Sequence, residues 1–447
     1  MIKKIINIAL FLTLFLLPLI IFPCGKFPDT YNTPKIILLY GCGIILLICL
    51  LIKYKELKFD KTDKILLLFL FLTCISTIFS VNVKESIFGT FNRYEGLLTF
   101  ICYFLIYYST KYYFNFNKKI INVSLICLFI INVIAILQYY NIPPIHEIFK
   151  SKYFGNSFAS ATFGNRNFYG SFLSICVPYT MCLYIFNNKK IYLLFSSISF
   201  IGLLVSLTRS AWLAFIICSI IGIIYIIKCK NKFFIKKAIV LLITFVSIFI
   251  LFYLSNTKTL KVRYNSTIKD ITSIANNVNI NTNTNTNSNS NNNDKQISTS
   301  NHKIGSGRVL IWEAAIKIIA KNPIIGCGPD AFLSELCNNH LSYLINDLHP
   351  KLKSFPDKAH NEYLQIASTI GIPALLLYLT FIILTLKKLI KNNLLESNQW
   401  FILFLCLIGY LIQAFFNIST IGVAPIFYFL LGYSYQVNDT VRLKDKN

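Results

Sequence analysis

Residues 238–254 read AIVLLITFVSIFILFYL, an apolar block without a charged side chain, and Lys236 and Lys237 stand directly before it. A run of this length crosses a hydrocarbon core of about 30 Å as an α-helix. A helix satisfies its backbone hydrogen bonds internally, which the interior of a bilayer requires. The block therefore predicts a membrane-spanning helix.

The same pattern repeats along the chain. Of the 447 residues, 55% are hydrophobic and only 14% are charged, whereas soluble domains carry about 25% charged residues. The apolar blocks predict an all-α, polytopic membrane protein of about 12 transmembrane helices. The predicted spans are 5–22, 36–52, 65–80, 96–110, 121–139, 168–186, 191–207, 210–227, 238–254, 371–386, 400–416 and 421–435.

The connections between the blocks divide the chain into three parts. Residues 1–254 hold the first nine spans, residues 255–369 form one large loop, and residues 370–447 hold the last three spans and a tail. Lysines concentrate in alternate short connections, so the positive-inside rule places both termini in the cytoplasm and the large loop outside the inner membrane. Within the loop, residues 276–301 are rich in Asn, Thr and Ser, a composition typical of disordered segments. The first block resembles a signal peptide but lacks a small-residue cleavage site, so we expect it to be retained as a span.

Arginine and histidine are distributed unevenly. The chain has only six Arg residues, and all except Arg442 fall on the predicted outer side. The five His residues also fall there: His146, His302, His340, His349 and His360. Lysine is sufficient as a topology signal, whereas Arg offers a planar fork that binds phosphate or carboxylate. The outer face is therefore the predicted functional face.

Composition also argues against several other classes of protein. The net charge of +25 would suit a nucleic-acid binder, but the lysines lie in short clusters between spans, so no nucleic-acid partner is expected. The thirteen Cys include no C-x-x-C pair and predict no metal site; a Cys327–Cys337 disulfide is left open. The spans contain almost no ionisable residues, which disfavours a proton-coupled transporter.

Four stretches on the outer side carry candidate functional residues. They are GTFNRYEG at 89–96, TFGNRNF at 162–168, LTRS at 207–210, and the part of the large loop that holds GSGRVLIW at 305–312, NPIIGCGP at 322–329 and AHNEYL at 359–364. Residues 308–320 predict a helix that ends at Asn322-Pro323. Its apolar face is expected to comprise Val309, Trp312, Ala315, Ile316 and Ile319. The segment 326–329 is expected to be a turn rather than a phosphate-binding loop, because no lysine and helix start follow it.

These motifs resemble those of the O-antigen ligase and O-antigen polymerase superfamily, over roughly residues 89–435. The resemblance implies a GT-C-like membrane glycosyltransferase whose large extracytoplasmic loop lies between spans 9 and 10. Such enzymes take a glycan from an undecaprenyl-diphosphate carrier and move it to a lipid- or protein-anchored acceptor, without a metal or another cofactor. The family's outer-face arginines match Arg209 and Arg308, and its loop histidine matches His360.

The residue types suit that chemistry. Without a metal, the charge of a diphosphate leaving group needs fixed cations, which Arg209 and Arg308 would supply. Pro356-Asp357 predicts a helix start with Asp357 as N-cap and His360 in the first turn, where the positive helix end keeps imidazole neutral and able to act as a base. Arg209 could instead anchor a helix end, and Arg308 and His360 could be ordinary surface residues.

Further residues are candidates for binding substrate: Arg93, Arg166, Asn165 and Tyr363. Glu95 is expected to form an ion pair with the adjacent Arg93. The activity expected is glycan ligation, with polymerisation of the same donor as the alternative and transport of lipid-linked sugars as a weaker one. The sequence identifies neither the sugar nor the acceptor.

Overall fold

The structure is a computed structural model that describes residues 1–22, 29–116, 118–143, 159–256, 308–338, 356–391 and 398–444, with three isolated positions at 262, 265 and 268. These residues form helices joined by turns, and no β-strand occurs among them. The all-α prediction is confirmed for this part of the chain. The Asn-rich segment 276–301 and the histidines at 146, 302, 340 and 349 lie outside the described residues.

A helix coincides with each of the twelve predicted spans. In chain order the long helices are α1 (Ile2–Phe11, continued by the π-helical Leu12–Leu16), α2 (Asn32–Ile52), α3 (Lys61–Ile78), α5 (Leu97–Tyr113), α6 (Lys118–Tyr139), α8 (Arg166–Phe186), α9 (Ile191–Ser206), α10 (Arg209–Cys229), α11 (Lys232–Ser255), α18 (Ile372–Lys391), α19 (Asn398–Ala414) and α20 (Ala424–Lys444). The shorter elements are η2 (Tyr54–Glu56), α4 (Val83–Phe88), η3 (Ala161–Phe163), α14 (Arg308–Lys321), α15 (Phe332–Asn338) and α17 (Glu362–Thr369).

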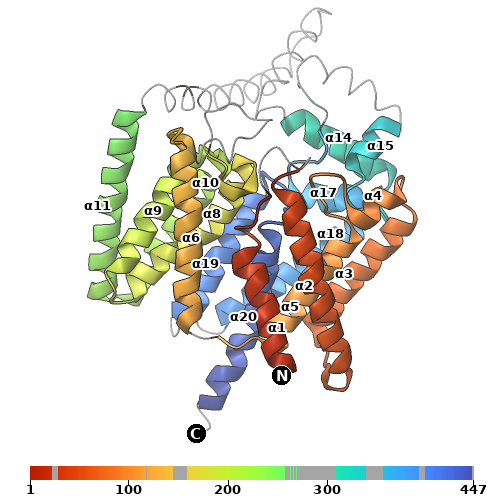
Figure 1. Ribbon diagram of the computed structural model, residues 1–447, viewed down its shortest axis with the longest axis horizontal. Coiled ribbons are helices and arrows are strands. Elements are labelled where there is room, and N and C mark those ends of the chain that lie inside the picture. Colours follow the sequence, from red (N-terminus) through yellow and green to blue (C-terminus); the bar gives the residue numbers. More distant parts are fainter. Residues whose placement is uncertain are drawn as a thin grey trace, which may run out of the picture.

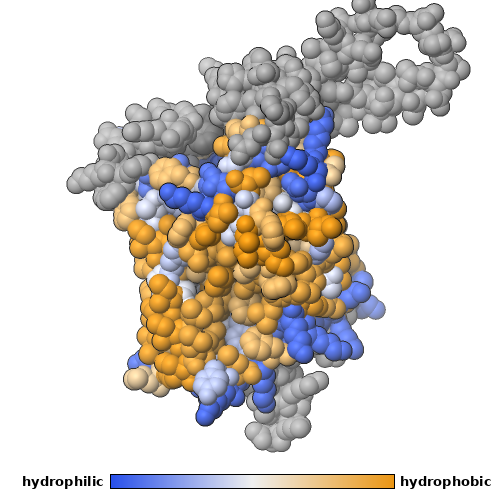
Figure 2. Space-filling view, turned by 90° about the vertical axis from the view of Figure 1, so that its right-hand side faces the viewer, coloured by the Kyte–Doolittle hydropathy of each residue, from blue (hydrophilic) through white to orange (hydrophobic). Residues whose placement is uncertain are grey.

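The structure is that of a polytopic membrane protein. Six helices among the described residues, α2, α6, α8, α10, α11 and α18, are long and apolar enough to cross a bilayer, and α9 and α19 are shorter apolar helices. Figure 2 shows a broad hydrophobic band across one face of the molecule, with hydrophilic residues gathered toward its two ends, as expected for a surface that faces lipid. The total of twelve spans stays a prediction.

Helix α8 is the centre of one half of the bundle. It packs against α9, α10 and α19, and its side chains are buried nearly throughout. In the other half α5 packs against α2, α3 and α20, and α3 packs against α18. By contrast α11 is mostly exposed, with only Leu241, Phe245 and Phe252 buried. The bundle thus buries α8 and leaves α11 to the surrounding lipid.

The two ends of the bundle differ. Helix α1 begins and α20 ends at the lower end of Figure 1, called the terminal end below. Helices α14, α15 and α17 lie at the opposite end, called the motif end, where α5, α8 and α10 begin. The two chain termini therefore lie at the same end.

The described part of the large loop has a small core of its own. Leu310, Ile311, Ala314, Ala315 and Ile318 of α14 are buried with Cys327, Phe332, Leu336 and Ala359. The helix extends to Lys321, one residue beyond its predicted end, and stops before Asn322-Pro323. The apolar face named from the sequence is not the face that packs: Val309 and Ile316 are exposed, and of its five residues only Ala315 is fully buried.

A glycine turn ties the segment after α14 to α17 and packs against the end of α3. The backbone N–H groups of Cys327 and Gly328 donate to the carbonyls of Ser368 (3.0 Å) and Thr369 (2.8 Å). Gly328 has a φ of 108°, and a Cβ there would collide with the Ser80 hydroxyl at the end of α3. Only glycine suits such a position. The prediction of a turn is confirmed, because these N–H groups are already paired and cannot cradle a phosphate.

Candidate functional site

The start of α8 and the start of α10 are fixed together. Asn165 is the N-cap of α8, and its side-chain oxygen accepts the Asn167 N–H at 2.8 Å. Leu207 adopts a left-handed conformation (φ 51°) that closes the turn between α9 and α10. The Thr208 hydroxyl then donates to the Arg166 carbonyl at 3.0 Å. Arg166 and Arg209 are therefore the first residues of two helices held side by side.

Gly170 makes this approach possible. A Cβ at residue 170 would lie 2.7 Å from the Thr208 methyl carbon, closer than side chains pack. Helix α8 can therefore approach the α9–α10 turn only with glycine at this position.

A third arginine joins these two. Arg308 begins α14, and its charge and that of Arg209 both act on the Arg166 guanidinium. Like charges concentrated at one site need an anion or other partners nearby, and guanidinium groups match phosphate oxygens in charge and geometry. The structure thus brings together three of the predicted site residues, and we call Arg166, Arg209 and Arg308 the arginine cluster.

Arg93 has a different partner from the predicted one. Its Nε lies 2.5 Å from an Asp357 carboxylate oxygen, and its guanidinium lies over the Phe168 ring at 5.3 Å from the centroid. Burial alone would raise the pKa of Asp357, but Arg93 together with neighbouring basic residues holds the pKa below its usual value. The predicted Arg93–Glu95 pair is wrong, because Arg93 pairs with Asp357 of the large loop.

Glu95 belongs to a buried ionic network that the sequence did not reveal. Lys358 contacts Glu95 at 2.9 Å and Asp330 at 2.8 Å, and all three side chains are nearly inaccessible to solvent. Asp330 also accepts the Thr90 N–H at 2.7 Å. Burial would lower the pKa of Lys358, but the two carboxylates outweigh it and raise the pKa above its usual value. The network ties two parts of the large loop to the start of α5.

His360 lies directly beside this network. It precedes Asn361, which caps α17 by accepting the N–H groups of Tyr363 (3.0 Å) and Leu364 (3.1 Å). The predicted cap at Asp357 is therefore wrong, since Asp357 pairs with Arg93 and the helix starts four residues later than it would after such a cap. The His360 backbone is left-handed, with a φ of 49°, a strained conformation often found at functional sites.

The environment of His360 keeps its imidazole neutral. Burial is the largest influence and lowers the pKa of His360 to about 4; Asp357 opposes the change, while Arg308 and Arg93 add to it. The predicted neutrality is therefore reproduced, although desolvation rather than a helix end is its main cause. The same charges show that His360 shares one electrostatic environment with Arg308.

One acidic and one aromatic residue of α17, Glu362 and Tyr363, follow His360 in the chain. Glu362 is buried and accepts hydrogen bonds from Tyr378 (2.8 Å) and Tyr410 (2.9 Å), and burial raises its pKa to about 7. Tyr363 donates its hydroxyl to the Leu411 carbonyl at 2.9 Å, and its ring lies near Phe415. Phe415 in turn contacts Trp312 of α14. Tyr363 therefore offers a ring rather than a free hydroxyl.

The described residues contain no group of three or more His, Cys, Asp or Glu side chains arranged to hold a metal ion. Cys327 and Cys337 are both free thiols, so the disulfide left open by the sequence is absent between these two residues. Lys358 and Asp330 are the site residues that sequence reasoning missed. Nothing in their local sequence distinguishes them from surface charges of a loop.

Residues 193–379 match the family model described as O-Antigen ligase. The match runs from α9 into α18 and so includes Arg209, Arg308 and His360. A search of the curated proteins finds no match. The resemblance drawn from the motifs is confirmed over the matched residues.

Proposed function

We propose, from the premise that residues 193–379 form an O-antigen ligase family domain of a polytopic membrane protein, that the chain transfers a glycan from an undecaprenyl-diphosphate carrier to an acceptor hydroxyl. The family implies a glycan-transfer enzyme. The observation that carries the finer proposal is the arrangement at the motif end. The charges of Arg209 and Arg308 both act on Arg166, and the neutral His360 lies in the field of Arg308.

The arginine cluster suits the donor. A carrier-linked glycan carries its charge on the diphosphate, and transfer leaves the full charge of the diphosphate on the departing carrier. Arg166, Arg209 and Arg308 would stabilise that charge with preorganised guanidinium groups, the type of interaction that contributes most to many enzymes. The Thr208 tether supports this role because it holds Arg209 and Arg166 in place before the donor binds.

His360 suits the acceptor. Its neutral imidazole would take the proton of the acceptor hydroxyl while that oxygen attacks the anomeric carbon. The new bond joins the acceptor oxygen to the sugar, and the bond between the sugar and the diphosphate breaks with its electrons going to the carrier. The proton ends on His360, and the carrier diphosphate leaves against the arginine cluster.

The remaining predicted residues take supporting roles in this proposal. Asn165 positions Arg166 by capping α8, and Arg93 holds Asp357 beside His360. The Tyr363 ring, next to Phe415, would provide an apolar surface for a sugar face. The motif end would face outward from the inner membrane, with both termini in the cytoplasm.

The acceptor distinguishes two activities. A ligase would pass the chain to a lipid- or protein-anchored acceptor, and a polymerase would pass it to another carrier-linked repeat. The proposal favours ligation because the matched family is described as O-Antigen ligase. Mass spectrometry of lipid-linked intermediates in cells that lack the protein separates the two. Complete carrier-linked chains that never reach an acceptor would support ligation, and single repeats without long chains would support polymerisation.

The chemistry is tested with variants in membrane vesicles supplied with carrier-linked glycan. His360→Gln and Arg209→Ala should each lower transfer by at least about a hundredfold. Lys190 is an exposed residue between α8 and α9 at the terminal end, and Lys190→Ala is the matched control that should transfer normally. Full activity in a folded His360→Gln or Arg209→Ala variant would refute the mechanism.

A further inference from the structure

A large cavity opens at the terminal end of the bundle, far from the arginine cluster. It has a volume of about 880 Å³ and lies among α1, α6, α8, α19 and α20. Its mouth includes Phe116, Lys119, Lys189 and Gln399, which stand at helix ends on the opposite side of the bundle from Arg166. The volume falls within the range of about 300–1,000 Å³ that small-molecule sites occupy.

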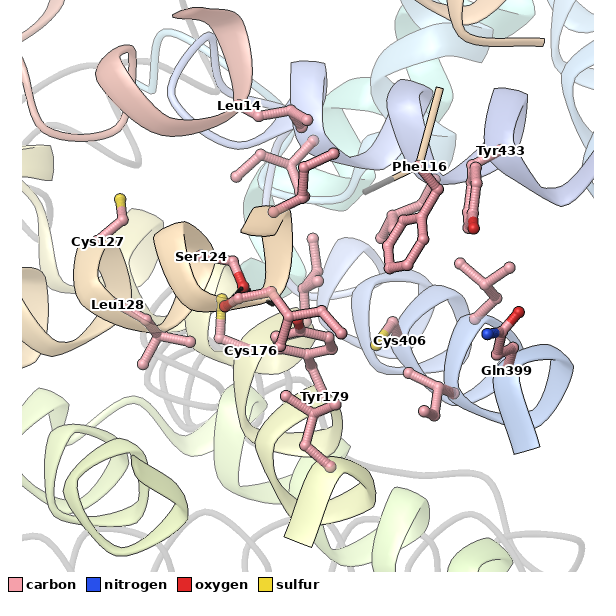
Figure 3. A pocket seen from close by; sticks show the side chains of 18 of the residues that line it. Leu14, Phe116, Ser124, Cys127, Leu128, Cys176, Tyr179, Gln399, Cys406 and Tyr433 are labelled. Carbon is pink, nitrogen blue, oxygen red and sulfur yellow. Dashed lines mark hydrogen bonds between the residues drawn. The ribbon is translucent and has the colours of Figure 1, made fainter. Parts of the chain in front are cut away.

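The depth of the cavity is apolar. Leu128, Cys176 and Cys406 line it about midway along their helices, and Figure 3 shows their side chains around the open space. The polar groups in this part are Ser124 and Tyr179, whose hydroxyls lie 2.9 Å apart and satisfy one another. At this depth these two hydroxyls therefore need no polar group from a ligand.

Such a space needs an apolar occupant. Protein interiors are close-packed, and an apolar void of this size loses the contacts that hold its walls together. Water does not fill cavities that lack polar partners. At this depth of a membrane protein the abundant apolar molecules are the hydrocarbon chains of lipids.

The mouth adds a preference for charge. Among the lining residues that the structure describes there are two lysines, Lys119 and Lys189, and no Asp or Glu. Both lysines are exposed, and Asn187 and Gln399 line the same cavity. Basic groups at a membrane surface attract anionic headgroups.

We propose that this cavity binds an anionic phospholipid. An acyl chain enters between α6, α8 and α19, and the phosphate lies at the mouth against Lys119 and Lys189. The proposal does not depend on glycan transfer, because the cavity and His360 lie at opposite ends of the bundle.

The test measures lipid retained by the full-length chain in detergent, by native mass spectrometry after addition of phosphatidylglycerol or phosphatidylcholine. The wild-type chain should retain phosphatidylglycerol in preference to phosphatidylcholine. Ile402→Trp places an indole in the cavity, since Ile402 is a lining residue, and should reduce retained phosphatidylglycerol about tenfold. Ile243→Trp on the exposed face of α11 is the matched control and should retain the wild-type amount.

A second variant tests the headgroup without altering the apolar walls. Lys119→Gln/Lys189→Gln should lower the preference for phosphatidylglycerol about tenfold and leave retention of phosphatidylcholine unchanged. Size-exclusion profiles show whether each variant is folded. Equal retention by Ile402→Trp and the wild type would overturn the site, and equal retention of both lipids by the wild type would overturn the assigned headgroup.

Discussion

His360 should remain neutral, and glycan transfer should remain fast, well below the pH at which an ordinary histidine becomes charged. The variable is the pH at which glycan transfer is measured. With a pKa of about 4, about 97% of the imidazole is neutral at pH 5.5, whereas a solvated histidine of pKa about 6.5 would be about 9% neutral. The rate at pH 5.5 should therefore be almost equal to that at pH 7.5, instead of about tenfold lower.

The quantity measured is kcat/KM for glycan transfer by the protein in liposomes, from pH 3.5 to pH 8. Glu362, with a pKa of about 7, could add a transition of its own, so the profile is repeated in Glu362→Gln. Asp357 raises the pKa of His360, and Asp357→Asn should therefore move the acid limb to lower pH. An acid limb centred near pH 6.5 in both backgrounds would refute the assignment of His360 as the base in this environment.

The lowered pKa of His360 also makes the stability of the folded protein depend on pH. The unfolded imidazole binds a proton below about pH 6.5, whereas the folded imidazole does not until about pH 4. The unfolded state therefore binds more protons in this window, and the contribution of His360 to stability falls as the pH falls from about 6.5 to 4.

Lys358→Met should lower the free energy of unfolding by about 3–5 kcal/mol because it leaves two buried carboxylates without a counterion; the deficit should narrow at acidic pH, and an unchanged thermal transition in detergent would contradict it. Arg209→Lys should transfer glycan about tenfold or more slowly than the wild type with little change in thermal stability, since lysine cannot provide the planar fork; equal kcat/KM would count against the role of Arg209. Gly170→Ala should lower the free energy of unfolding by about 1–3 kcal/mol and slow glycan transfer, because the added carbon displaces Thr208. In Gly222→Ala the added carbon meets nothing within 4 Å, so this control should keep the wild-type stability and transfer rate.

The sequence was sufficient to predict the helices but not the side chains that join them. Each predicted apolar block coincides with a helix, because the length of an apolar run can be read directly from the local sequence. The bounds of α14 were also predicted, since Pro323 stops a helix whatever its surroundings. Its buried face was not, because most residues of that segment are apolar, and packing against Cys327 and Phe332 rather than periodicity selects the face.

For the site too, the sequence identified candidate residues but not the partners of their side chains. Arg166, Arg209, Arg308 and His360 were identified from motifs, and the structure places them at the same end of the bundle. The local pairing of Arg93 with Glu95 failed because both partners were found in the large loop, more than 260 residues away. Asp357 and Asn361 are both good N-cap residues, so only the structure could show which of them caps α17.

The glycine turn at residues 326–328 has a consequence for how the loop can change. The turn and the Lys358 network attach α14, α15 and α17 to the ends of α3 and α5, so the position of Arg308 and His360 is set by the bundle. These attachments are all made by residues that follow Arg308 in the sequence. A change in the length of the stretch 276–301 should therefore leave Arg308 and His360 fixed to the same two helix ends.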